Sequence, residues 1–600
     1  MSADESWSRT GRLQQEVATL LGVARRRGTV SGVVHLRNEP GRQPEPRSSP
    51  TAAGPDETTG ASADETTAPE DPAALPVAGS FVVNATDTGA PVRFAVHSVR
   101  RVAGGTVLDY SVTALPSDGQ VAGDQIDSSA ELDFAGFRNA PNVNLVDVPA
   151  AQLYRPLADD SGACVCTFVY PSGLVVGETE LHQAAYPALP DDVSEVTVEF
   201  GNGPLLEAVP VLDEGTVPTA LDSVDLAAEA AELLVVASTR AFDYPIATPF
   251  IQAAQRQPLR IDVNEVVSGP GGTSLVWTIN ATGSGEGLVD VGTPVTDYRL
   301  APVTVAIKTG VASGPGLRPS DDPAGPVMRS WFATVKAMGD NTFSDVEAGD
   351  WRFCLCSDYQ FYGDGVNESG ESRTFVTHLP PLPEGTTTVD VVFPDDSLPP
   401  LPDIDVDEAA TSTLGEPEDG PGTSEWSSPE GGLPRDAFTP DEWPIPVPDE
   451  ASMSSVEPIV DDLLVKESLP AAQREQQKQR VEITLDSTIS FQPDSAELTA
   501  TARDGIADIA AQIDDEAADG SAVSIEGHVA GSDQGSASFQ MQLSVDRADA
   551  VLAELRPQVK TDVELTAQGF GAEKPLVPND TEANRQLNRR VVVVFTSTDG

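Results

Sequence analysis

The C-terminal part of the chain, residues 480–600, alternates between helical and strand-like spacings of its hydrophobic positions. A helical spacing runs through Leu498, Ala502, Ile506, Ile509, Ala510 and Ile513. Asp494 and Glu497 precede these residues in the arrangement of a capping box, so we expect a helix to begin near Ser495.

Strand-like patterns and a second helical pattern follow in the same region. Val523 and Ile525 alternate with polar neighbours, as do Val563, Leu565 and Ala567, which is typical of half-buried strands. Ser544 is the expected N-cap of a helix that carries Ala548, Val551, Leu552 and Leu555. Residues 591–595, four β-branched valines followed by Phe595, form a run suited to a strand buried on both faces. The alternation of strands and helices predicts a small α/β domain.

The middle of the chain contains an internal repeat. Residues 92–106 align without a gap on 259–273, and 108–112 align on 275–279. Cys164-Val165-Cys166 matches Cys354-Leu355-Cys356, and the Leu-Pro pairs at 189–190 and 382–383 also correspond. We therefore predict a tandem duplication over 79–213 and 257–406. Short alternating runs separated by turn residues predict an all-β, Ig-like sandwich in each copy.

The remaining segments lack such patterns. Residues 1–78 are expected to be largely disordered, because 38–78 is rich in Pro, Thr, Ser, Glu, Asp and Gly. The connector 214–256 is expected to be partly helical, on the Ala, Leu and Glu content of 221–239. Residues 407–479, with Trp426 and Trp443 isolated among Pro, Glu, Asp, Ser and Gly, are expected to form an extended acidic linker.

The chain is strongly acidic, with 36 Lys and Arg residues against 94 Asp and Glu residues and a formal net charge of -58. Such a charge repels nucleic acid and anionic lipid, so no nucleic-acid partner is expected. Two origins of the acidity stay open, namely adaptation to high salt and a wall-associated protein with acidic linkers.

No stretch approaches the roughly 18 apolar residues that cross a bilayer, and residues 1–28 carry several charges but no secretory signal core. Three explanations stay open: the true start of the protein lies upstream of Met1, export uses another route, or the protein stays inside the cell. We favour an upstream start, because 38–78 looks like the spacer that commonly follows an anchor.

All four cysteines lie in the two Cys-x-Cys pairs. Residues i and i+2 of a strand share a face but lie too far apart for a relaxed disulfide, so a bridge within a pair needs a turn or strain. Three interpretations stay open, and the first is favoured: a disulfide in each pair, buried free thiols, or a four-cysteine metal site. Metal is disfavoured because structural zinc sites usually separate their cysteines by two to four residues. We expect no metal and no cofactor.

The last part of the chain also carries an ordered set of short motifs. They are Gly527-His528, Leu543-Ser544 with Arg547-Ala548, Gly-Phe-Gly-Ala-Glu-Lys-Pro at 569–575, and Asn-Asp-Thr-Glu-Ala-Asn-Arg-Gln-Leu-Asn-Arg-Arg-Val at 579–591. The set resembles the OmpA-like C-terminal domain family of OmpA, Pal and MotB. The resemblance implies a βαβαβ-type fold and non-covalent binding to peptidoglycan. The repeats resemble Cys-Leu-Cys β-modules that precede such domains in envelope proteins of high-GC Gram-positive bacteria.

The resemblance also implies a set of ligand-binding residues. A diaminopimelate-type stem peptide offers carboxylates and an ammonium group, and in the family an Arg and an Asp bind them. Arg547 matches the Arg, whose planar fork suits a carboxylate. Ala530 stands where the family has its Asp, and Asp533 would supply the carboxylate if two extra loop residues bulge out. The other positions carried over from the family are Gln540, Leu543, Asn584, Arg585 and Arg589.

No enzyme motif appears, and the five His residues have no catalytic or metal-ligand spacing. His182 and His378 are expected at surface strand edges, and His528 is expected to be a structural or rim residue. The sequence therefore predicts a non-catalytic, wall-associated envelope protein, whose sandwiches are candidates for docking another envelope protein. The alternative is a scaffold module whose OmpA-like domain has lost its ligand.

Overall fold

The computed structural model describes residues 75–598 with gaps. The gaps longer than five residues are 85–90, 117–122, 127–142, 168–173, 220–239, 246–257, 282–314, 336–350, 357–371, 394–399 and 427–436. The chain divides into Met1–Pro69 and Glu70–Gly600, and every element described below belongs to the second part. The expected disorder of 1–78 and the expected helix in 221–239 fall mainly outside the described residues.

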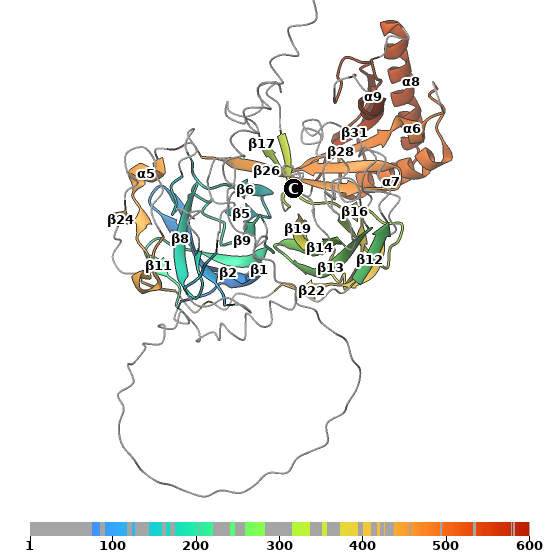
Figure 1. Ribbon diagram of the computed structural model, residues 1–600. Coiled ribbons are helices and arrows are strands. Elements are labelled where there is room, and N and C mark those ends of the chain that lie inside the picture. Colours follow the sequence, from blue (N-terminus) through green and yellow to red (C-terminus); the bar gives the residue numbers. More distant parts are fainter. Residues whose placement is uncertain are drawn as a thin grey trace, which may run out of the picture. The chain divides into compact units, whose positions relative to one another are not determined.

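The first β module contains two groups of paired strands (Figure 1). One sheet has the antiparallel order β1 (Gly79–Asn84), β2 (Pro91–Val102), β3 (Gly105–Ala114) and β8 (Thr179–Tyr186). The other has the order β6 (Gln152–Tyr154), β5 (Val143–Asp147), β9 (Glu195–Phe200) and β10 (Leu206–Leu212). A small pair is formed by β4 (Gln125–Ile126) and β7 (Leu174–Val175). Apolar residues of both sheets share one core, which includes Phe94, Leu108, Leu145 and Val198.

The second β module repeats this arrangement. Its first sheet has the antiparallel order β12 (Arg240–Pro245), β13 (Pro258–Gly269), β14 (Gly272–Ala281) and β19 (Ser372–Leu379). Its other strands are β15 (Gly316–Pro319), β16 (Val327–Met328), β17 (Phe332–Val335), β18 (Trp351–Cys354), β20 (Thr388–Val392) and β21 (Leu401–Asp405). Because β12 belongs to this sheet, the module begins near 240, and the boundary predicted at 257 is wrong.

The two modules correspond in register as well as in order. The β2–β3 hairpin shifts its register between Val96 and Ser98, and the β13–β14 hairpin shifts between Val263 and Glu265, which is the aligned position. Beyond the hairpin, Thr106 lies opposite Tyr186, and Thr273 lies opposite Leu379. A bulge at one aligned position in both copies agrees with the duplication read from the sequence, because bulges fix strand register.

Much of the predicted linker 407–479 is folded. It contains β22 (Asp407–Glu408), β23 (Glu418–Asp419), which pairs with β11 (Thr216–Val217), β24 (Glu425–Trp426), η4 (Pro440–Glu442), β25 (Val447–Pro448), α5 (Glu450–Ser454), β26 (Val460–Ser468) and β27 (Ala472–Gln477). Trp426, Phe438 and Met453 are buried in a cluster with Val107 and Leu181 of the first module. The prediction of an extended linker is therefore wrong for these residues, because their few apolar side chains pack on a β sheet.

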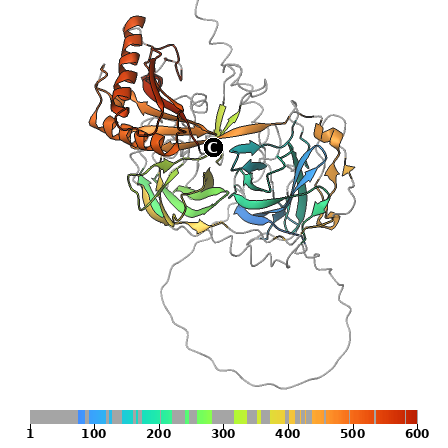
Figure 2. The same ribbon diagram turned by 180° about the vertical axis from the view of Figure 1, so that it is seen from behind.

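The C-terminal domain is a mixed sheet with the order β27, β28 (Arg480–Asp486), β31 (Arg590–Thr596), β29 (Ala522–His528) and β30 (Glu564–Gly569). The helices are α6 (Ser487–Ser490), α7 (Ala500–Glu516), α8 (Ala537–Leu555) and α9 (Glu582–Asn588). Apolar residues of α7 and α8 share one core with β28, β29 and β31, so both long helices lie on one face of the sheet (Figures 1 and 2). The predicted α/β domain and its strands are confirmed.

Both predicted helix starts are wrong. Helix α7 begins after Thr499, whose Oγ1 accepts a hydrogen bond from the Ala502 N–H at 3.1 Å. Ser495 instead closes a local turn, since its Oγ accepts from the Glu497 N–H at 2.9 Å, and Asp494 lies outside the described residues. Helix α8 begins after Ser536, so Ser544 lies inside the helix rather than at its N-cap. Among the described helices, none is long and apolar enough to cross a membrane.

Candidate ligand-binding site of the C-terminal domain

Two glycines let α8 lie directly against the sheet. Gly527 and Gly569 are paired neighbours at the ends of the parallel strands β29 and β30. A Cβ atom on Gly527 would collide with the backbone carbonyl of Ser544, and one on Gly569 would collide with Val545 and the Ser544 hydroxyl. The glycines of two separate motifs thus serve a single close helix–sheet contact.

Gly527→Ala tests this contact. The added methyl group has no free space, so the helix must move away from β29, and overpacking of this kind typically costs about 1–3 kcal/mol. We expect a lower free energy of unfolding in a denaturant titration. Ser524→Ala, on the same strand but away from the helix contact, is the control. Equal stability of Gly527→Ala and the parent would show that α8 does not pack this closely.

Ser544 connects α8 to the loop that follows β30. Its Oγ donates to the Met541 carbonyl at 2.7 Å and accepts from the Gly571 N–H at 2.8 Å. The Val529 N–H in turn donates to the Gly571 carbonyl at 2.9 Å. The loops that follow β29 and β30 are therefore held together at the end of the sheet where the motifs converge.

Asn588 organises the rest of this end of the domain. Its Oδ1 accepts from the backbone N–H groups of Leu576 and Val577 at 2.7 and 3.0 Å, and its Nδ2 donates to the Val577 carbonyl at 2.7 Å. The same Nδ2 donates to Asn579 Oδ1 at 2.9 Å. Both polar atoms of the buried Asn588 side chain are hydrogen-bonded within the domain, so this residue of the Asn-Arg-Arg motif supports a loop.

His528 belongs to the scaffold rather than to an acid–base site. Its buried ring stacks on Phe570 with centroids 5.4 Å apart. Burial, reinforced by the positive charges of Arg590 and Lys574, lowers the pKa of His528 to about 4. The imidazole is therefore neutral near pH 7, in agreement with the structural role expected for it.

Arg547 is a buried cation whose contacts include a hydrogen bond and an aromatic ring. Its side chain lies on α8 with 5% of its surface exposed, and Nε donates to the Ser495 carbonyl at 3.0 Å. The guanidinium carbon lies 5.0 Å from the centre of the Phe491 ring, within cation–π range. These contacts hold the guanidinium in one orientation.

Arg585 and Arg589 both bind one carboxylate. Arg585 Nε lies 2.9 Å from Glu582 Oε2, and Arg589 Nη2 lies 2.7 Å from Glu582 Oε1. The hydrogen bonds from Arg589 and then Arg585 hold the pKa of Glu582 below its usual range. The sequence reading missed Glu582, although its spacing of three residues from Arg585 on a helix was a usable signal.

The other candidates lie on the same two helices or outside the described residues. Gln540 and Leu543 are half-buried on α8, and Asn584 is fully buried on α9. Asp533 lies outside the described residues. The structure thus places Arg547, Gln540 and Leu543 on α8, and Asn584, Arg585 and Arg589 at α9.

The cysteines form a disulfide within each pair, Cys164–Cys166 and Cys354–Cys356. A bend at Val165 and another at Leu355 bring the Cα atoms of each pair to 5.3 and 5.4 Å, which is within the range of a disulfide. The turn that a bridge between residues i and i+2 requires is therefore present in both modules.

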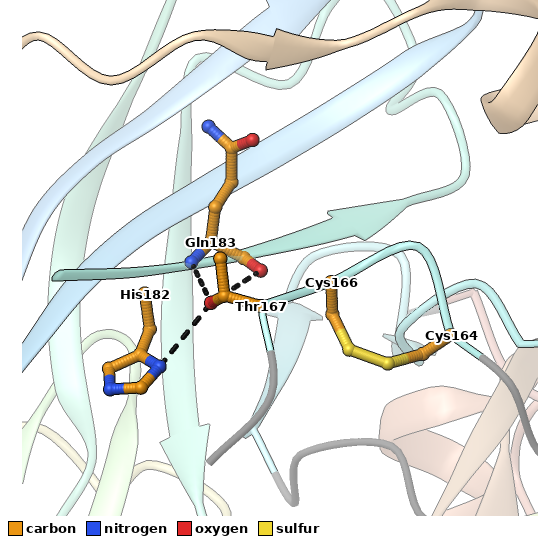
Figure 3. The surroundings of a disulfide bond; sticks show 5 residues. All are labelled: Cys164, Cys166, Thr167, His182 and Gln183. Carbon is orange, nitrogen blue, oxygen red and sulfur yellow. Dashed lines mark hydrogen bonds between the residues drawn. A yellow bond between two sulfur atoms is a disulfide. The ribbon is translucent and has the colours of Figure 1, made fainter. Parts of the chain in front are cut away.

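Two histidines near the pairs are buried, so their predicted position at surface strand edges is wrong. Figure 3 shows His182 beside Thr167, whose Oγ1 lies 3.3 Å from His182 Nδ1 and accepts from the Gln183 N–H at 2.7 Å. His378 Nε2 lies 3.3 Å from the Phe200 carbonyl, and burial lowers the pKa of His378 to about 4. Both strands are covered on the face that carries the histidine.

Comparison with known families places one domain. Residues 490–589 match the family model described as the OmpA family, so the chain carries an OmpA-family domain there. Among curated proteins, no significant match was found.

Similar solved structures each cover about a fifth of this chain. The periplasmic domain of Helicobacter pylori MotB is 22% identical, with a TM-score of 0.19, over 21% of this chain and 82% of that one. The cell wall anchor of the T6SS from Pseudomonas aeruginosa is 21% identical, with a TM-score of 0.19, over 21% and 88%. A putative MotB-like protein from Desulfovibrio vulgaris is 24% identical, with a TM-score of 0.17, over 20% and 75%.

Proposed function

We propose that this is a non-catalytic cell-envelope protein whose C-terminal domain binds peptidoglycan non-covalently, through a diaminopimelate-type stem peptide. The OmpA-family domain at 490–589 supports a peptidoglycan-binding envelope role in general. The observation that carries the finer proposal is the fixed, buried guanidinium of Arg547, at the position the motif assigns to carboxylate recognition.

A fixed arginine suits this ligand for a physical reason. Carboxylates bind a guanidinium fork best when its orientation is already set, because less side-chain entropy is then lost on binding. Ala530 cannot supply the anion that an ammonium group needs, so Asp533 would have to do so. Carboxylate recognition by Arg547 therefore carries most of the proposed affinity.

The β modules complete the proposal. We infer that both are Ig-like sandwiches derived from one ancestor, supported by their matching bulges and strand registers. A disulfide in each supports an oxidising, extracytoplasmic compartment. Another envelope protein remains the proposed partner of these modules.

A protein-interaction role of the C-terminal domain is the second candidate. Phe539, in the first turn of α8, has 53% of its surface exposed, and Leu576 in the loop after β30 has 41% exposed. Exposed aromatic and aliphatic side chains are common in protein interfaces. This role becomes the favoured one if the peptidoglycan experiment fails.

The test is co-sedimentation of the full chain with purified diaminopimelate-type peptidoglycan. Arg547→Met retains an unbranched aliphatic chain like that of arginine but removes the guanidinium charge. Losing one partner of a buried charged contact typically costs about 2–5 kcal/mol. We expect retention to fall at least about thirtyfold. Arg547→Lys should recover only part of it, because an ammonium lacks the planar fork.

Arg503→Ala is the matched control, because it also removes a charged arginine from a helix of this domain. Arg503 lies exposed on α7, and its Nε lies 3.5 Å from Glu554 Oε2 at the surface. Thermal unfolding of each variant separates lost binding from lost folding. Ala530→Asp should strengthen retention if the loop follows the family path. Parental retention by folded Arg547→Met contradicts the peptidoglycan site and favours the protein-interaction role.

A further inference from the structure

The residue between the two cysteines lies in a closed cycle of backbone hydrogen bonds. In the first module the Val165 N–H donates to the Leu157 carbonyl at 2.9 Å, and the Leu157 N–H donates to the Ala185 carbonyl at 2.7 Å. The Ala185 N–H completes the cycle at the Val165 carbonyl, at 3.0 Å. Three chain segments are therefore joined at the residue that the disulfide encloses.

The second module contains the same cycle at the corresponding residues. The Leu355 N–H donates to the Trp331 carbonyl at 2.8 Å, the Trp331 N–H to the His378 carbonyl at 2.9 Å, and the His378 N–H to the Leu355 carbonyl at 2.9 Å. Such a cycle needs both backbone groups of the enclosed residue to point at other segments, and the bend between the cysteines provides this.

Each disulfide also separates two hydrophobic clusters. Cys164 and Cys166 belong to the core of the first module, and Cys354 and Cys356 pack against the core of the second. The enclosed residues point the other way. Val165 belongs to the cluster that contains Trp426 and Phe438, whereas Leu355 packs with Trp331, Ala333 and Leu463.

Leu355 therefore contributes to the attachment of β26. Leu463 lies on that strand and is paired with Ala333 of β17. If the bend at Leu355 relaxed, its side chain would leave this cluster, and the hydrogen bonds to Trp331 and His378 would weaken. The disulfide holds the bend in place.

The two disulfides differ in their access to solvent. Cys164 and Cys166, whose disulfide is drawn in Figure 3, are 2% and 0% exposed. Cys354 and Cys356 are only partly buried. A reductant must approach a sulfur atom directly to react with it, so the second disulfide is the more reactive of the two.

We propose that Cys354–Cys356 is a redox-responsive clamp, which a dithiol opens to loosen β26 from the second module, while Cys164–Cys166 stays closed as a structural element. One thiolate of the dithiol attacks a cysteine sulfur and breaks the S–S bond, and the released thiolate takes up a proton. The second thiol of the reductant then forms its own disulfide and releases the other cysteine as a thiol. The protein gains two electrons and two protons, and the dithiol is oxidised.

Opening the clamp leaves the module folded. In the chain-entropy account a disulfide stabilises less as the loop it closes becomes shorter, and this loop encloses a single residue. The effect of reduction is therefore local to the hydrogen-bond cycle and to the cluster around Leu355.

The test begins with timed reduction of the full chain by dithiothreitol, trapping with a maleimide and peptide mass spectrometry. We expect Cys354 and Cys356 to be labelled at least about tenfold faster than Cys164 and Cys166, since access controls the rate. Equal rates, or faster labelling of the first pair, would overturn the proposal.

Hydrogen exchange of the partly reduced protein tests whether opening the disulfide loosens the hydrogen bonds around Leu355. Peptides containing Trp331, Leu355 and His378 should exchange faster after reduction, and those containing Leu157, Val165 and Ala185 should not change. The double variant Cys354→Ser with Cys356→Ser should reproduce this pattern without reductant. If hydrogen exchange around Leu355 is unchanged after Cys354 and Cys356 are completely labelled, the clamp is contradicted. This outcome does not depend on whether the double variant folds.

Discussion

Trp426→Ala should lower the free energy of unfolding of the first β module by roughly 3–5 kcal/mol, the usual cost of removing a buried tryptophan. The indole is 6% exposed, and its Nε1 donates to Gln183 Oε1 at 2.9 Å. Gln183 Nε2 donates to Asp109 Oδ1 at 2.7 Å, and Arg100 Nε donates to Asp109 Oδ2 at 2.8 Å. The variant leaves a cavity and also removes the donor that the buried Gln183 oxygen uses.

The measurement is a denaturant titration followed by circular dichroism, with Trp426→Phe beside it. Phenylalanine keeps most of the packing but lacks the N–H donor, so the loss in stability should be smaller, about 1–2 kcal/mol. Protease cleavage within 437–454 should become faster in Trp426→Ala. If the alanine variant matches the parent in both measurements, this segment does not pack on the module and the linker interpretation is restored.

The folded character of 407–479 shows what composition cannot reveal. The segment is rich in residues that disfavour a core, and both of its tryptophans, Trp426 and Trp443, stand singly among them. Trp426 finds its partner Gln183 at a sequence separation of 243 residues. No local window contains both members of such a pair, so only tertiary structure shows that the tryptophan is buried.

The sequence predicted best where one local pattern determined the outcome. The apolar run of α7 is buried as expected, and β31 contains the valine-rich run at 591–595. The predicted starts of α7 and α8 were wrong because more than one polar residue could serve as the N-cap of each helix. Thr499 caps α7, whereas Ser544 inside α8 bonds to Gly571, a long-range partner that local spacing does not show.

The candidate site was predictable in its motifs but not in its geometry. Motif order identified Arg547, yet its contacts with Phe491 and Ser495 depend on how α8 packs against the chain before α7. Arg585 and Arg589 were named as ligand groups, and the structure pairs both with Glu582. Asn584 and Asn588 are buried, whereas Arg585 and Arg589 of the same motif are partly exposed. The motif alone does not distinguish the buried residues from the surface ones.

Glu199→Gln should make the first β module less sensitive to alkaline pH. Glu199 lies on β9 with 3% of its surface exposed, and its Oε2 accepts from Asn144 Nδ2 at 2.6 Å. Its Oε1 lies 3.5 Å from His378 Nε2. Burial raises the pKa of Glu199 from 4.5 to about 7, although the hydrogen bond from Asn144 and the charge of Arg155 both oppose the shift.

A raised folded-state pKa fixes the sign of the pH effect. The folded protein holds the proton more tightly than the unfolded chain, so the contribution of Glu199 is fully present below pH 4.5 and is lost as pH rises through about 7. A shift of this size corresponds to roughly 3 kcal/mol, at about 1.4 kcal/mol per pKa unit. Glutamine carries no charge, so the variant avoids this loss.

The measurement is the free energy of unfolding of parent and variant at about pH 4.5 and about pH 8.5. We expect Glu199→Gln to gain roughly 3 kcal/mol relative to the parent between these two values. Glu195→Gln is the control, because this glutamate is exposed on the same strand, and its difference from the parent should stay constant. If the Glu199→Gln curve runs parallel to that of the parent, the carboxylate is ionised in the folded protein at neutral pH, and β9 carries a buried charge that its neighbours fully stabilise.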